Sequence, residues 1–119
     1  MPVISKFVAL RNYIPTGLPK ETDFEIRKKE ISLDDNNNIL VLNLWISVDP
    51  YMRARMTERK NYKPPFNIGE EMEGYALGIV KESKDKNFKE GDVVFSNFGM
   101  RDYFAVSYTH LTLPTKRIV

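Results

Sequence analysis

A chain of 119 residues, 42% hydrophobic and 12% aromatic, is long enough for one globular domain with a modest core and is not typical of a disordered protein. Its 18 basic and 16 acidic side chains leave a net charge of +2, which is too balanced to indicate a nucleic-acid or membrane partner. The sequence has no cysteine and one histidine, His110, which excludes a disulfide, a thiolate zinc ligand and a multi-histidine metal site within this chain.

The first third of the chain predicts two strands separated by a loop. Val3 to Leu10 is apolar and rich in residues that favour strands. The stretch from Asn12 to Lys20 contains two prolines and a glycine, which indicate a loop. Phe24 to Leu33 alternates along the chain as expected of a strand with one face in water. The polar cluster Asp34 to Asn38 then favours a turn.

The most apolar run of the sequence, Ile39 to Val48, predicts a strand in the interior of a closed or two-layered sheet. Its even-numbered residues form one wholly apolar face, and its odd-numbered residues form a mixed face. Trp45 belongs to the mixed face, and we expect it in the core rather than in a site.

The run ends at Asp49 and Pro50, where we expect one short helix to begin. Asp49 can accept hydrogen bonds from the free N–H groups of a first helical turn, and Pro50 suits the first helical position. A buried strand that leads into a capped helix would hold the following side chains in fixed directions. Tyr51, Arg53 and Arg55 are therefore the polar side chains expected to point at a binding partner. The simpler interpretation is a strand–helix junction with arginines that face solvent.

The second half of the chain predicts further short strands and loops. Thr57 to Gly69 includes consecutive prolines and is expected to be a long loop. An acidic run at Glu70, Glu71 and Glu73 is expected to be a solvated face without a catalytic carboxylate. The expected strands are Tyr75 to Lys81, Val93 to Phe95, and Arg101 to Val106. Several short strands with little helix indicate an all-β barrel or sandwich.

Three segments in this order resemble a known family: residues 17–24 (GLPKETDF), 43–53 (NLWISVDPYMR) and 88–94 (FKEGDVV). They resemble the N-terminal part of the zinc-free medium-chain dehydrogenase/reductases. Within that family they look most like the NADPH-dependent 2-alkenal double-bond reductases and prostaglandin (leukotriene) reductases. The likeness covers residues 3–106. The run from Ser47 to Arg53 is its most specific part, whereas the whole superfamily shares the Gly91-Asp92 turn.

The resemblance implies a mainly β fold, a GroES-like, partly open β-barrel with one short helix that normally precedes a Rossmann domain. It also implies reduction of the C=C bond of α,β-unsaturated aldehydes and ketones by hydride from NADPH, with a small-molecule enal or enone as substrate. Zinc-dependent relatives place their first cysteine ligand about where Ser47-Val48-Asp49 stands here. With no cysteine, no metal is expected, and hydrogen-bond donors would stabilise the developing enolate.

The resemblance carries over to three residues. Pro50 and Tyr51 match the family's Pro-Tyr pair beside the nicotinamide end of the cofactor, so both are candidate cofactor-binding residues. Tyr51 and Tyr75 are candidate substrate-binding residues. The alternative for Tyr51 is a buried tyrosine that closes the barrel, and for Tyr75 it is ordinary strand packing. No residue of this chain is assigned as catalytic.

Other polar and aromatic residues receive weaker assignments. Arg53 and Arg55 could attract the cofactor's phosphates. The family binds the 2′-phosphate mainly through residues of its Rossmann domain. Structural salt bridges are therefore favoured for Arg53 and Arg55. Phe98, Met100 and Tyr103 fall where the family's barrel faces its cleft.

The chain departs from the family pattern in two respects. It contains no Gly-x-Gly-x-x-Gly phosphate loop, so we expect the Rossmann domain to be absent and the chain to be a fragment, inactive alone and without tight NADPH binding. The likeness also stops near Val106. Residues 107–119 resemble a translated sequencing adapter after a truncated reading frame, or form a divergent last strand. On the first interpretation this tail should pack poorly.

The rival hypothesis is a stand-alone, non-catalytic GroES-like binding module that uses the Lys60–Pro65 loop and the barrel edge. Reading the DNA beyond the codon for Val106 would distinguish it from a reductase. The N-terminus lacks the features of a signal peptide, and no apolar run approaches the ~20 residues of a membrane helix. A cytoplasmic location is therefore expected. The parent family is often homodimeric, mostly through its other half.

Overall fold

The computed structural model describes residues 2–57 and 64–112, and for Tyr51 the backbone alone. Its elements are β1 (Val3–Leu10), the 3-10 helix η1 (Glu21–Asp23), β2 (Phe24–Ile31), β3 (Ile39–Ile46), α1 (Tyr51–Ala54), β4 (Ala76–Ser83), β5 (Val93–Ser96), β6 (Tyr103–Val106) and the 3-10 helix η2 (Tyr108–His110). The predicted mainly β fold with one short α-helix is confirmed. No helix within the described ranges is long and apolar enough to cross a membrane.

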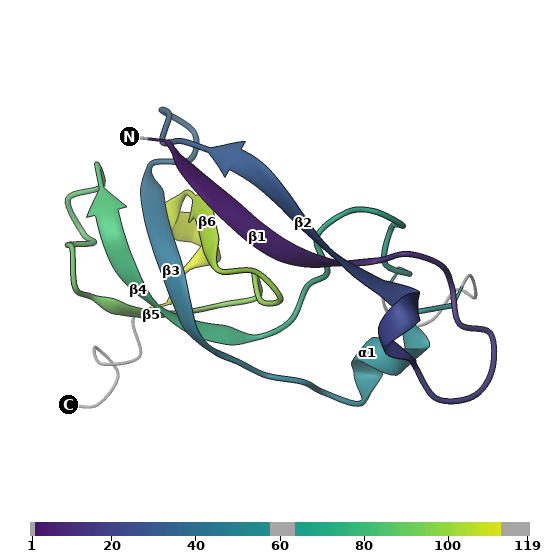
Figure 1. Ribbon diagram of the computed structural model, residues 1–119. Helices are drawn as coiled ribbons and strands as arrows, with labels where there is room; N and C mark the ends of the chain where they lie inside the picture. The colour runs from purple at the N-terminus through teal and green to yellow at the C-terminus, as the bar shows by residue number, and fades with distance from the viewer. Residues whose placement is uncertain (1, 58–63, 113–119) are drawn as a thin grey trace.

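The strands form two antiparallel sheets that make a partly open barrel. β1 and β2 form a two-stranded ribbon, and the second sheet has the order β5-β4-β3-β6. In Figure 1 the ribbon runs diagonally from the N-terminus towards α1. Isolated bridges join Phe7 to Arg101 and Ala9 to Glu71, so β1 connects to the loops of the larger sheet.

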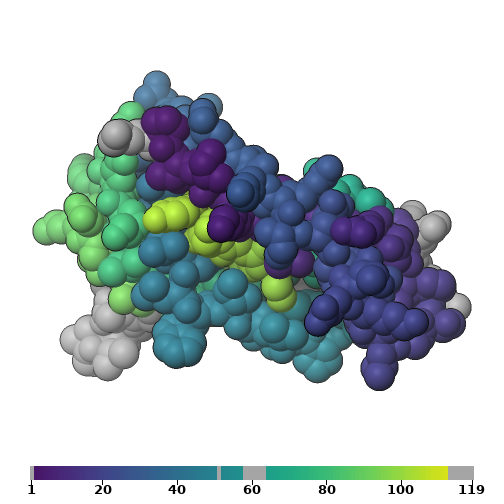
Figure 2. Space-filling view, in the orientation of Figure 1, coloured from purple at the N-terminus to yellow at the C-terminus, as the bar shows by residue number. Residues whose placement is uncertain are grey.

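The loop before β6 lies between the ribbon and β3. The Val8 N–H donates to the Met100 carbonyl at 2.8 Å, and the Asp102 N–H donates to the Lys6 carbonyl at 3.0 Å. On the other side, the Asn43 N–H donates to the Asp102 carbonyl at 2.7 Å. Figure 2 shows this yellow-green segment between the purple and blue ribbon and the teal region of β3 and α1.

β3 is an interior strand, as predicted, but its two halves have different surroundings. Ile39, Leu40 and Val41 are buried, whereas Trp45 is 73% exposed. β6 pairs only with residues 39–42 of β3, and a register shift interrupts the pairing with β4 between Asn43 and Trp45. The second half of β3 therefore extends beyond the packed layer, and the expectation that Trp45 lies in the core is wrong.

Two apolar clusters occupy opposite ends of the described structure. The first lies in the larger sheet and contains Ile39, Val41, Val80, Phe88, Val94, Phe104, Val106 and Leu111. The second joins the end of β1 to α1 and contains Leu10, Ile14, Met52, Met56, Phe66 and Met72. Since α1 supplies Met52 to the second cluster and Met56 follows just after the helix, apolar packing stabilises this very short helix more than its own backbone bonds do.

The chain after Val106 packs onto the larger sheet. Leu111 is 8% exposed and belongs to the first cluster. Thr112 and Phe95 exchange two backbone hydrogen bonds, of 2.8 and 3.1 Å, at the free edge of β5. The expectation of poor packing is wrong for Leu111 and Thr112, because a leucine fills the end of the core and the sheet edge accepts the backbone, whereas Tyr108, Thr109 and His110 are exposed. Residues 113–119 lie outside the described residues, and the division of the chain at Val106 stays a prediction.

Candidate functional site

The junction between β3 and α1 is fixed by short-range hydrogen bonds. The Ser47 hydroxyl donates to the Asp49 carboxylate at 2.8 Å, and the Met52 N–H donates to the Asp49 carbonyl at 3.1 Å. The prediction that the Asp49 side chain caps the first turn of α1 is therefore wrong. The Asp49 carboxylate is engaged by Ser47, and Pro50 precedes the first helical residue, with helical dihedral angles of −57° and −31°.

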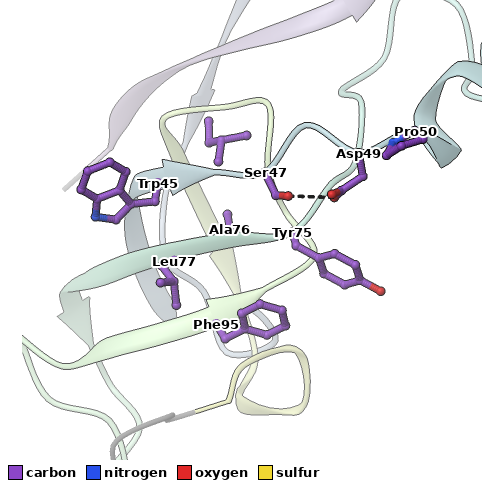
Figure 3. Close-up of a pocket in the computed structure, with 9 residues that line it drawn as sticks. Trp45, Ser47, Asp49, Pro50, Tyr75, Ala76, Leu77 and Phe95 are labelled. Atoms are coloured by element: carbon purple, nitrogen blue, oxygen red, sulfur yellow. Dashed lines mark hydrogen bonds between the residues drawn. The ribbon is translucent and has the colours of Figure 1, made fainter.

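An apolar recess of about 710 Å³ opens beside this junction. Trp45 pairs with Leu77, and Leu77 pairs with Phe95, so these side chains form a row across β3, β4 and β5 on one face of the sheet. Figure 3 shows this row together with Ser47, Asp49 and Pro50 at the far end of the recess. The lining is completed by Ile46, Tyr75 and Ala76.

Tyr75 forms part of the wall, just before β4 begins. Its ring stacks on Phe95 with a centroid distance of 5.4 Å and an interplanar angle of 21°. Its carbonyl accepts a 2.9 Å hydrogen bond from the Ser47 N–H. The residue is 40% exposed, so the stacked pair presents a flat aromatic surface to the opening.

The structure thus places two of the three predicted site residues, Pro50 and Tyr75, on one recess. Tyr51 is the first residue of α1, and its side chain lies outside the described atoms. Whether these residues bind cofactor or substrate stays a prediction. The recess walls Trp45, Leu77 and Phe95 were not predicted, although their alternation along three strands was a signal that could have indicated them.

Arg53 in α1 and Arg55, the residue that follows the helix, have structural partners. Arg55 is buried, forms a 3.0 Å ion pair with Glu73 and lies 4.2 Å from the centre of the Phe66 ring. The prediction of a salt bridge is confirmed for Arg55. For Arg53 it stays a prediction; its guanidinium donates two hydrogen bonds, of 3.2 and 2.9 Å, to the Gly17 carbonyl. This contact holds the loop before η1 against α1.

The acidic run is only in part the solvated face that was expected, because Glu70 is exposed whereas Glu71 and Glu73 form ion pairs. Glu71 forms ion pairs with Lys29 and, at 4.0 Å, with Arg101, and its side chain is only 19% exposed. Burial acts to raise the pKa of Glu71, but the hydrogen bond from Lys29 and the charges of Lys29 and Arg101 lower it overall. Burial disfavours the charged form of Arg101 as well, and it lowers the pKa of this guanidinium. The charges of Glu71 and Glu73 act in the opposite direction but do not cancel this effect. The missed signal was the spacing of Glu71 and Glu73, because residues two apart in an extended chain point the same way.

Phe98, Met100 and Tyr103, expected where the family's barrel faces its cleft, are not part of the recess lining, and their place at that cleft stays a prediction. Met100 lines a second apolar groove of about 540 Å³ beside α1. Phe98 packs against the first core cluster, with His110 edge-on at 5.3 Å. Tyr103 accepts a 2.6 Å hydrogen bond at its carbonyl from the Ser5 hydroxyl. Within the described ranges, no three His, Cys, Asp or Glu side chains are grouped closely enough to hold a metal ion.

The partly open antiparallel barrel, with a strand–helix junction that borders an apolar recess, is the GroES-like class of domain. A family described as the N-terminal domain of oxidoreductase matches residues 6–113. The chain belongs to this family, and the resemblance to zinc-free medium-chain dehydrogenase/reductases is confirmed.

Known proteins of this kind are similar over most of the chain. The NADP(+)-dependent 2-alkenal reductase of Nicotiana tabacum is 40% identical over 111 residues, which cover 90% of this chain and 32% of that protein. Prostaglandin reductase 1 of Rattus norvegicus is 34% identical over 83 residues, which cover 70% of this chain and 23% of that protein. The crystal structure of CurA in complex with NADPH from Vibrio vulnificus has a TM-score of 0.81 and 29% identity, covering 91% of this chain and 32% of that chain. The present chain thus spans about a third of the length of the first of these relatives.

Proposed function

We propose that this chain is the N-terminal part of an NADPH-dependent reductase that acts on the C=C bond of α,β-unsaturated aldehydes and ketones. The observation that carries the proposal is the apolar recess whose stacked Tyr75–Phe95 wall lies beside the Pro50–Tyr51 segment. An enal or enone is flat and conjugated, with one polar atom, and such a group fits an aromatic wall with few polar neighbours.

The recess also fits the nicotinamide end of the cofactor, which is flat as well. Pro50 and Tyr51 would border that ring, and the bound NADPH would supply the hydride for the β-carbon. The phosphates require basic or N–H donors, whereas the polar side chains on the recess lining are Ser47, Asp49 and Tyr75. The phosphate-binding residues are therefore proposed to lie elsewhere in a longer protein.

The residues of this chain act on the substrate by excluding water and by setting its orientation. Tyr75 and Phe95 hold the conjugated plane against one wall, and Trp45 and Leu77 extend that wall across the sheet. Negative charge develops on the carbonyl oxygen as the β-carbon is reduced, and the Tyr51 phenol is the proposed donor to that oxygen. The hydrogen bond from Ser47 to Asp49 keeps the Pro50–Tyr51 segment in place. The 119-residue chain by itself is proposed to be inactive, since it supplies walls and one donor but no phosphate loop.

The test is steady-state oxidation of NADPH by the full-length protein that carries this sequence. Short and long 2-alkenals should be reduced to saturated aldehydes. The matched saturated aldehydes should not be consumed, because they lack the reacting double bond. No oxidation with any enal or enone, or reduction of the saturated aldehydes instead, would overturn the proposal. A homodimer and a cytoplasmic location are further expectations, which gel filtration and cell fractionation of the same protein would test.

The alternative is a stand-alone binding module, and no described contact favours it. Of the Lys60–Pro65 loop that it would use, only Pro64 and Pro65 are among the described residues. DNA that continues the reading frame after Val106 into a nucleotide-binding domain would decide for the reductase, and a stop there would decide for the module.

A further inference from the structure

The segment 69–74, which leads into Tyr75, is held by four basic side chains from three separate parts of the chain. Two of these side chains come from β2, one from the residue that follows α1 and one from the loop before β6. The contacts are Arg27 Nη1 to the Gly69 carbonyl at 2.9 Å, Lys29 to the Glu71 carboxylate, Arg55 Nη1 to Glu73 Oε1 at 3.0 Å, and Arg101 Nη2 to the Met72 carbonyl at 2.9 Å.

Arg101 has the largest number of partners in this set. Its side chain is 10% exposed, and besides the Met72 carbonyl it donates from Nε to the Gly99 carbonyl at 3.0 Å. It also lies 4.0 Å from a Glu71 oxygen and 5.4 Å from the centre of the Phe98 ring. A planar guanidinium can donate to two carbonyls in fixed directions at once, which a lysine ammonium does not reproduce.

The two loops that Arg101 joins meet one residue before Tyr75. The Gly99 N–H donates to the Gly74 carbonyl at 2.7 Å, and the Gly74 N–H donates to the Asn97 carbonyl at 3.3 Å. A Cβ atom at Gly99 would lie 2.7 Å from that same Gly74 oxygen, so the loops are in close backbone contact. The Tyr75 carbonyl itself accepts from the N–H of Ser47, the residue that follows β3. The backbone position of Tyr75 is therefore fixed by hydrogen bonds from the loop before β6 to Gly74 and from Ser47 to Tyr75 itself.

We propose that Arg101 is a positioning residue for the recess. By binding the Met72 and Gly99 carbonyls, it fixes the backbone on which the Tyr75 wall stands. This inference rests on the proposed function, since the position of Tyr75 affects catalysis only if the recess holds the substrate.

The test is a double-mutant cycle in the full-length protein, with wild type, Arg101→Met, Tyr75→Ala and the double variant. We expect Arg101→Met to lower kcat/KM for a 2-alkenal roughly tenfold, mainly by raising KM, which is less than the roughly hundredfold cost of displacing a reacting group by ~1 Å. In the Tyr75→Ala background the same change should have almost no effect, because the wall that Arg101 positions is gone. Arg27→Met is the matched control: it also removes a donor to this segment, but at its far end, and should leave kcat/KM within twofold.

A second readout is independent of turnover. Amide hydrogen exchange at Ser47 and Gly99 should be faster in Arg101→Met and intermediate in Arg101→Lys, because these amides donate to Tyr75 and Gly74. Unchanged exchange at both amides, or activity losses that multiply in the double variant, would overturn the inference. If Arg101→Met shows no cooperative melting transition, Glu71→Gln takes its place in the same cycle with the same two criteria. A wild-type protein that reduces no enone would refute the proposed function, while the exchange rates would still decide whether Arg101 positions Tyr75.

Discussion

Tyr75 and Tyr51 border the same junction but offer different chemistry. Tyr75 contributes a ring stacked on Phe95, with its backbone bonded to Ser47. Tyr51 begins α1, directly after Pro50. A wall binds substrate and transition state alike, whereas a donor to the carbonyl oxygen interacts most strongly when charge develops there. The two side chains should therefore affect different kinetic constants.

In the full-length enzyme, Tyr75→Ala should raise KM and change the preference for chain length, because it removes apolar wall. Tyr51→Phe should lower kcat/KM by less than the ~2.7–4 kcal/mol typical of a sole oxyanion donor, since other groups share that role. Steady-state NADPH oxidation with short and long 2-alkenals measures both effects. Tyr108→Ala is the control, because Tyr108 is 58% exposed and is not part of the recess lining. Wild-type kinetics of both variants on every enone would contradict the assignment.

Glu71 makes folding stability depend on pH. Its pKa is lowered in the folded state from the ordinary value of 4.5, so the folded state binds this proton less readily than the unfolded chain does. The stabilisation is therefore present above about pH 4.5 and is lost as pH falls through the lower, folded-state pKa.

We expect Glu71→Gln to lose less unfolding free energy than wild type as the pH falls below 4.5 through the lowered, folded-state pKa of Glu71. At neutral pH the variant should be less stable by no more than the ~1.5–3 kcal/mol of a hydrogen bond to a charged group. Urea unfolding at a series of pH values measures this dependence. Glu70→Gln, at an exposed neighbouring position, is the control. Identical pH profiles for wild type and Glu71→Gln would show that the ion pairs with Lys29 and Arg101 do not contribute.

At the scale of elements, the larger sheet continues past β5. The backbone of Thr112 pairs with Phe95, and Leu111 turns into the cluster formed by β3, β4, β5 and β6. A buried leucine at the end of a core excludes water from the strands beneath it. The segment after η2 thus closes one edge of the sheet and covers one end of its core.

Leu111→Ala should therefore destabilise the protein by about 2–5 kcal/mol, the usual cost of a buried leucine that leaves a cavity. Leu18→Ala removes the same atoms from a side chain that is 86% exposed and should change stability by less than about 0.5 kcal/mol. Thermal and urea unfolding measure both variants. An unchanged stability of Leu111→Ala would mean that the tail does not contribute to the core.

At the scale of the whole molecule, the chain combines two apolar clusters with a recess that carries almost no basic side chains. The recess lining includes the carboxylate of Asp49, which repels phosphate groups. A dinucleotide gains much of its affinity from phosphate contacts, so we expect this chain alone to bind NADPH weakly although its recess suits a flat ring.

Titration of NADPH with the 119-residue chain should therefore give no saturable change in NADPH emission, whereas the full-length protein should saturate. Competition with NADP+ is the control for specific binding. Saturable, NADP+-sensitive binding by the short chain would contradict this expectation and place phosphate-binding residues within it.

Local features were predictable because they depend on neighbours in the chain. The apolar run at residues 39–48 predicted β3, and Pro50 predicted the start of α1 to within one residue. Since both depend on backbone restrictions and alternation, no knowledge of distant residues was needed. The family motif at Pro50 and the aromatic at Tyr75 likewise indicated two residues that the structure places on the lining of one recess.

What the tertiary structure decided was the surroundings of each side chain. Trp45 is exposed because β6 ends its pairing at Leu42, and Leu111 is buried because β5 leaves an edge open. Arg101 and Glu71 form their ion pair across 30 positions of sequence, which no local pattern encodes. Alternation and turn residues determine where a strand begins and which side chains share a face. Burial and ion pairing depend on which distant segment lies against that face, and only the assembled sheets define that.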